Sequence, residues 1–85
     1  MAYRIEFKPS AARSLSKLPH PAQRAIADTL DGLRANPRAP GVVKLSGEPD
    51  LYRVRAGNCR IVYTIEDKAL LILVVRIAHR REVYR

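Results

Sequence analysis

LYRVRAGNCRIVYTI, residues 51–65, is the stretch that decides the fold. Its first part alternates apolar with basic residues, and its last part carries an apolar residue at every second position. Period-two alternation predicts two strands that each bury one face. Gly57 and Asn58 stand between them and form a turn pair. The stretch therefore predicts a β-hairpin, with Tyr52 and Val54 turned toward the core. The second strand would bury Cys59, Ile61, Tyr63 and Ile65.

The hairpin extends outward in both directions. Residues 70–77 are apolar on both faces except for one arginine, which predicts a buried central strand. Residues 2–7 alternate and predict a first strand, whereas Pro- and Gly-rich residues 38–50 predict a loop. Between them, apolar residues recur at helical spacing in two stripes separated by Pro19-His20-Pro21. The stripes are Ala11, Leu15 and Leu18, and then Ala22, Ile26, Leu30 and Leu33.

The expected architecture is a single α+β domain over residues 1–85 in the order β-α-α-β-β-β. The helical hairpin should pack on one face of a small antiparallel sheet, because each element has one apolar face to bury.

Composition narrows the function. Sixteen Lys and Arg against eight Asp and Glu give a formal net charge of +8 in 85 residues, so nucleic acid is the leading class of partner. A single cysteine excludes an internal disulfide and fits a reducing cytoplasm. One Cys and two distant His residues match no familiar metal spacing. The longest apolar run, residues 69–75, is far shorter than the ~20 residues of a membrane helix. We therefore expect a soluble cytoplasmic protein without a metal.

Three arginines should converge on one side of the predicted hairpin. Arg53 and Arg55 are two apart on one strand and share a face, roughly 7 Å apart. Arg60 points away from Ile61 on the next strand, toward the same side. Like charges this close destabilise one another unless an anion neutralises them. Two interpretations stand at this point: a phosphate site, or a solvated basic face that serves solubility.

The segment HRREVYR, residues 79–85, is unusually rich in reactive groups. An imidazole, three guanidiniums, a carboxylate and a phenol are the groups that hold a phosphodiester and move protons around it. The alternative is a solvated basic tail. Arg76 interrupts the apolar strand before this segment, and we favour a structural role for it, holding a loop carbonyl or Glu6.

These residues, in this order and spacing, resemble the RelE/ParE toxin superfamily, and more closely its RelE side. The resemblance is carried by residues 51–65 and 74–84, together with residues 44–47 and the opening strand, and it spans essentially the whole chain. It implies a RelE-like, microbial-RNase-like fold and the toxin half of a type II toxin–antitoxin pair. Such a toxin is an mRNA interferase, a metal- and cofactor-independent endoribonuclease that cuts mRNA in the ribosomal A site.

The resemblance also implies partners and chemistry. The 2′-hydroxyl attacks the adjacent phosphate and leaves a 2′,3′-cyclic phosphate and a 5′-hydroxyl. The partners are the ribosome and its mRNA, and an acidic, RelB-like antitoxin. Operator DNA is contacted only through the toxin–antitoxin complex, and no membrane is involved.

The family's site residues map onto several positions of this chain. The catalytic candidates are Arg53, Arg55, Arg60, His79, Arg80 and Tyr84. Lys44, Arg81 and Arg85 are expected to contact RNA or the ribosome. Relatives often carry lysines where Arg53 and Arg55 stand. Because arginine does not give up its proton in proteins, we expect these two to stabilise charge. Proton transfer then falls on His79 and Tyr84, with the acid and the base unassigned.

Two alternatives remain at the level of sequence. A ParE-like protein shares the fold but inhibits DNA gyrase instead of cutting RNA. A catalytically weakened toxin would act only as a module that binds nucleic acid or the ribosome.

Overall fold

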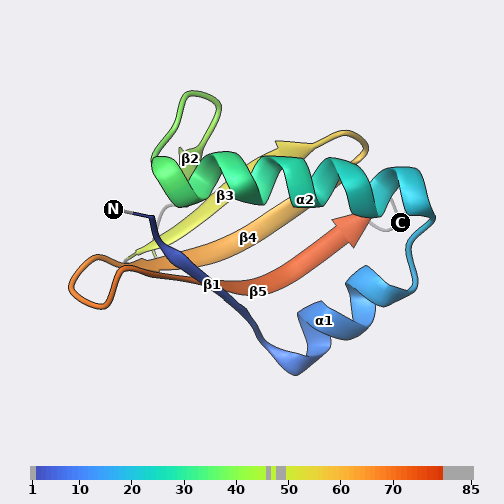
Figure 1. The fold of residues 1–85 in the computed structure, drawn as a ribbon, viewed down its shortest axis with the longest axis horizontal. Coiled ribbons are helices and arrows are strands. Elements are labelled where there is room, and N and C mark those ends of the chain that lie inside the picture. Colours follow the sequence, from blue (N-terminus) through green and yellow to red (C-terminus); the bar gives the residue numbers. More distant parts are fainter. Residues whose placement is uncertain (1, 46, 48–49, 80–85) are drawn as a thin grey trace.

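A computed structural model describes residues 2–45, 47 and 50–79. Five strands and two helices follow one another along this part of the chain (Figure 1). They are β1 (Arg4–Phe7), α1 (Pro9–Ser16), α2 (His20–Ala35), β2 (Val43–Lys44), β3 (Leu51–Ala56), β4 (Cys59–Glu66) and β5 (Leu71–His79). The α+β class and the predicted order of the main elements are confirmed. A short additional strand, β2, lies within the segment predicted as a loop.

The sheet is mixed, so the prediction of a purely antiparallel sheet was wrong. Its strand order is β1-β5-β4-β3-β2, and β1 pairs with β5 in the parallel direction. The other three strand pairs are antiparallel. Parallel strands need a long crossover connection, and everything between β1 and β5 supplies it here. The strand order makes β4 the middle strand, whereas β5, which was predicted to be the central strand, lies next to it between β1 and β4.

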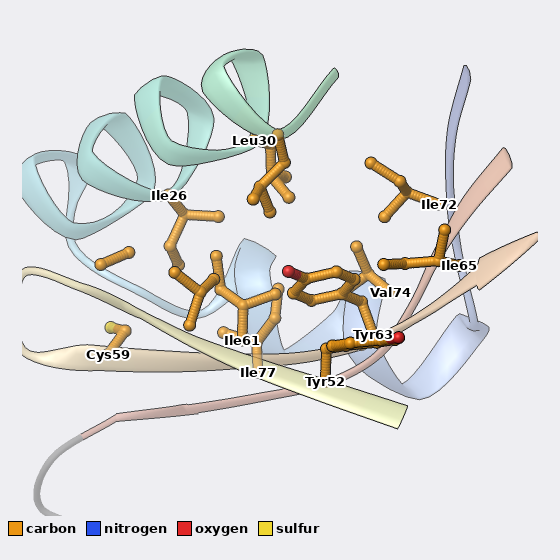
Figure 2. Packing of buried hydrophobic residues seen from close by; sticks show 14 residues of the cluster. Ile26, Leu30, Tyr52, Cys59, Ile61, Tyr63, Ile65, Ile72, Val74 and Ile77 are labelled. Carbon is orange, nitrogen blue, oxygen red and sulfur yellow. The ribbon is translucent and has the colours of Figure 1, made fainter. Parts of the chain in front are cut away.

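Both helices cover one face of the sheet, where the core lies. Figure 2 shows Ile61, Tyr63 and Val74 between the strands and helix α2. Ala11 of α1 joins the same buried cluster. The side chain of Gln23 in α2 donates hydrogen bonds to the carbonyl oxygens of Leu15 in α1 and of Leu18 in the connection that follows, which fixes the helical hairpin. Most of the predicted core residues are confirmed as buried: Ile26, Leu30, Leu33, Tyr52, Val54, Cys59, Ile61, Tyr63 and Ile65. Leu15, Leu18 and Ala22 of the predicted helix stripes are only partly buried and pack against this core.

A β-bulge interrupts the pairing of β4 with β5. Tyr63 pairs with Val74, but the next residue back, Val62, pairs with Arg76. Val75 is therefore the extra residue of β5. A bulge of this kind shifts the alternation of the strand by one position. Arg76 consequently faces away from the helices, and Ile77 returns to the core. We call the face turned away from both helices the open face.

A polar cluster, the Asp67 clasp, closes the end of the sheet near the β4–β5 turn. The Nη1 and Nη2 atoms of Arg38 donate to the two oxygens of Asp67 at 3.1 and 2.9 Å, and Tyr3 Oη donates to the same carboxylate at 2.7 Å. The Arg38 guanidinium also lies 5.5 Å from the ring centre of Tyr52. Hydrogen bonds from Arg38 and then from Tyr3 hold the pKa of Asp67 below its ordinary value. The clasp joins the segment after α2 to β1 and to the β4–β5 turn.

Candidate phosphate-binding site on the open face of the sheet

The structure brings Arg53, Arg55 and Arg60 together on the open face. Arg55 pairs directly with Arg60 across the β3–β4 hairpin. Directly opposed residues have Cβ atoms roughly 4.5–5.5 Å apart. Arg53 lies two residues before Arg55 on β3, on the same face. The tight turn at Gly57, whose φ is +59°, makes this close register possible.

A hollow lies against these three arginines. Its volume is about 410 Å³, and Gly41 and Val43 border it on the side of the β2 edge. Val43 pairs with Arg53, which places it on the open face beside the cluster. The hollow thus has a cationic wall and an apolar rim, a combination suited to a group that carries both negative charge and an uncharged ring.

Acidic side chains of the described segments do not balance this cluster. The two ion pairs between described residues join Arg4 to Glu6 and Arg38 to Asp67, and neither includes an arginine of the cluster. Arg55 pairs with another arginine, so repulsion across the hairpin is built into the register. Guanidinium groups present forked donors that match phosphate oxygens. An anion bound here would relieve the repulsion and be held by several charged hydrogen bonds.

His79 does not join the arginines on the open face. It pairs with Cys59, whose side chain is fully buried in the core, whereas Ala78 pairs with Arg60. Paired residues share a face, so the half-buried His79 belongs to the helix-covered face. Lys44 pairs with Tyr52 and is exposed on that same side at the sheet edge. The other predicted site residues, Arg80, Arg81, Tyr84 and Arg85, lie outside the described residues.

Arg76 is a cation of the open face that sequence reasoning assigned elsewhere. Its side chain is exposed, and Glu6, the partner expected for it, is paired with Arg4 at 2.9 Å. The hydrogen bonds and ion pairs between described residues do not include Arg76, so the structural role expected for it was wrong. Residues 71–75, just before Arg76, are all apolar and give no sign of a bulge, so the face of Arg76 was not readable from the sequence.

The tyrosine side chains of the described residues stabilise the core and the end of the sheet. Tyr52 and Tyr63 are buried with stacked rings 6.0 Å apart, and Tyr63 Oη donates to the carbonyl oxygen of Pro37 at 2.8 Å. Burial, with a smaller contribution from Tyr52, raises the pKa of Tyr63 to about 12. Tyr3 belongs to the Asp67 clasp. These three side chains are therefore structural, and for Tyr52 and Tyr63 this is what the alternation predicted.

Two further properties of the described residues bear on the kind of site. His, Cys, Asp and Glu side chains in these segments do not gather into a group that could hold a metal ion. Helices α1 and α2 also lack the length and apolar character needed to cross a membrane.

Comparison with known proteins places this geometry in a family. Residues 5–84 match the family described as "ParE toxin of type II toxin-antitoxin system, parDE". Toxin RelE of Mycobacterium tuberculosis is 31% identical over 84 residues, covering 98% of this chain and 87% of its own length. Toxin RelG of the same organism is 29% identical, covering 100% of this chain and 99% of its own length.

The fold agrees with solved structures. The archaeal RelE–RelB complex from Pyrococcus horikoshii superposes with a TM-score of 0.82 at 29% identity, covering 94% of this chain and 97% of that chain. The chain matches the family over nearly its whole length and has the same fold, so it shares the ancestry and architecture of the family. The chain therefore belongs to the RelE/ParE superfamily of toxins of type II toxin–antitoxin systems.

Proposed function

We propose that this toxin is a ribosome-dependent endoribonuclease that cuts mRNA in the A site. The observation that carries the proposal is the cluster of Arg53, Arg55 and Arg60 around a hollow on the open face, without acidic partners among the described residues. Relatives that bear the name RelE share its fold. The cluster has the charge and the forked donors that a phosphodiester requires.

The reaction assigned to the site is internal transfer at phosphorus. The 2′-oxygen of one nucleotide forms a bond to the adjacent phosphorus, and the bond from phosphorus to the 5′-oxygen of the next nucleotide breaks. Negative charge accumulates on the equatorial oxygens of the five-coordinate transition state. Arg53, Arg55 and Arg60 stabilise that charge, because fixed donors contribute most where charge develops. The 2′-hydroxyl must also lose a proton, and the leaving 5′-oxygen must gain one.

Tyr84 is the first candidate for the proton transfers. His79 starts from the helix-covered face, whereas the phosphate would lie on the open face. We therefore assign His79 to supporting the end of β5. The guanidinium of Arg80 and the phenol of Tyr84, which match the C-terminal arginine and tyrosine of the family, would complete the site.

We further propose that an acidic, RelB-type antitoxin neutralises this toxin. Solved relatives are RelE–RelB complexes from Pyrococcus horikoshii and a RelBE2 toxin–antitoxin complex from Mycobacterium tuberculosis. The formal net charge of +8 favours an acidic partner. Covering the open face would block the access of RNA to the arginine cluster.

Induced expression tests the proposed activity. Cells expressing the wild-type toxin should show mRNA 5′ ends that recur with codon spacing, and cells expressing Arg60→Gln should not. Arg13→Gln is the matched control, because it removes an exposed arginine of α1 and should leave the cuts in place. Melting curves of the three proteins separate a lost site from a lost fold.

The ParE-like alternative has one observation in its favour, the name of the matching family. It predicts breaks in DNA held by gyrase and intact mRNA in the same cells. That result would replace the proposed activity. Salt-sensitive binding of RNA without any cleavage product would instead indicate a weakened toxin.

A further inference from the structure

Arg76 owes its direction to the β-bulge in β5. Val74 is fully buried, so strict alternation would turn Arg76 into the core as well. The extra residue Val75 moves Arg76 to the open face, opposite Val62. Ile77, only 3% exposed, then occupies the core position that alternation would have given to Arg76. The bulge therefore serves both faces, since it keeps a charge out of the core and presents it beside the arginine cluster.

Arg76 extends the arginine cluster across the sheet. Val62 pairs with Arg53 on one side and with Arg76 on the other, so the two arginines are two strand spacings apart, roughly 9–10 Å. Arg60 pairs with Ala78, which makes Arg76 its diagonal neighbour at roughly 7–8 Å. Arg76 does not line the hollow. It stands one strand farther along the same face.

The charge of Arg76 is not used within the described part of the fold. Its side chain is exposed, and the nearby acid Glu6 is occupied by Arg4. A further guanidinium on this face adds to the repulsion among those of Arg53, Arg55 and Arg60. A ligand with negative charges repeated along its length would relieve that repulsion both at the arginine cluster and at Arg76. A single-stranded nucleic acid has this property, because its backbone carries one phosphate for each nucleotide.

We propose, on the basis of the RNA cleavage inferred above, that Arg76 binds a phosphate next to the scissile one. Arg53, Arg55 and Arg60 hold the scissile phosphate beside the hollow. From there the RNA chain runs across β4 toward β5. Contacts with phosphates fix the position of a nucleic acid without reading its sequence. Arg76 is thus a positioning residue that touches the substrate away from the reacting atoms.

Single-turnover cleavage on programmed ribosomes tests this role. The mRNA is prepared unmodified, or with one phosphate made neutral as a methylphosphonate, on either the 5′ or the 3′ side of the scissile phosphate. Arg76→Ala should cleave the unmodified mRNA roughly tenfold more slowly than wild type. On one of the two modified mRNAs the variant and the wild type should cleave equally, because the contact is already absent. Arg76→Lys should recover part of the rate.

Controls separate the inference from the proposed function. Arg13→Ala should match wild type on every mRNA, since its arginine lies on α1. A wild-type protein that cuts none of the mRNAs would overturn the endoribonuclease activity and the role of Arg76 with it. An active wild type with no loss in Arg76→Ala, or with the same loss on all three mRNAs, would overturn the role of Arg76 alone. The second pattern is what a merely structural defect produces.

Discussion

At the residue scale, His79 is separated from the arginines with which it was expected to act. His79 pairs with Cys59 on the helix-covered face, and the arginine cluster is on the open face. The resemblance to the family had grouped the imidazole with the arginines as a catalytic candidate. That expectation ignored the bulge, which shifts every position after Val75 to the other face. Alternation counted from Val74 would have put His79 on the open face.

We predict different kinetic effects for His79→Gln and Tyr84→Phe. A residue that transfers a proton in the transition state contributes about 10²–10⁴-fold. Tyr84→Phe should therefore slow single-turnover cleavage on ribosomes by about 10²-fold or more. His79→Gln should lose less than about tenfold, an effect expected of a supporting residue. The opposite ranking, with melting temperatures unchanged, would return proton transfer to His79.

At the element scale, hairpins were predictable and partner strands were not. The β3–β4 hairpin is recognisable from its alternation and from the Gly57-Asn58 turn. The convergence of three arginines could therefore be predicted from the local sequence. The pairing of β1 with β5 joins residues far apart in the chain, and β1 carries no local mark of its neighbour or direction. The bulge also has no local signal in the sequence, because residues 71–75 are apolar on both faces. Arg76 and His79 are the residues whose faces depend on it.

The Asp67 clasp gives the chain an acid-sensitive connection between elements. Arg38 and Tyr3 hold the pKa of Asp67 below its ordinary value, so the folded state favours the carboxylate. The resulting stability is present above the ordinary pKa of about 3.9 and is lost as the pH falls through the lower, folded-state value. Asp67→Asn should lower the urea midpoint at pH 7, and the difference from wild type should shrink in strong acid.

Glu66→Gln provides the matched control, since Glu66 is exposed beside Asp67 and forms no ion pair with the described residues. Its urea midpoint should stay close to wild type at both pH values. A difference between Asp67→Asn and wild type that is the same at neutral and strongly acidic pH would show that the clasp acts by packing and not by charge.

At the scale of the whole molecule, stability rests on a thin core. A chain of this size buries a smaller fraction of its surface than a larger domain does. Ile61, fully buried in the middle strand, is one of the side chains on which the core depends. Ile61→Ala should cost about 2–5 kcal/mol in the free energy of unfolding, out of a typical total of about 5–15 kcal/mol. Urea unfolding measures both values.

Val43→Ala is the comparison for that change, because Val43 is 47% exposed. Its cost should stay within about 0.5 kcal/mol. Equal costs for the two substitutions would mean that the apolar edge of the sheet contributes as much stability as its centre.

The parallel pairing of β1 with β5 has a consequence for the order of events during synthesis. A ribosome makes β1 before all the other strands, yet Arg4–Phe7 finds its only neighbour in the sheet at Leu71–Val74, among the described strands. The first strand must therefore wait, unpaired, until the last has left the exit tunnel. Contacts so distant in the chain slow folding. A toxin built in this way acquires its finished sheet, and the arginine face that the sheet supports, only after β5 has been made.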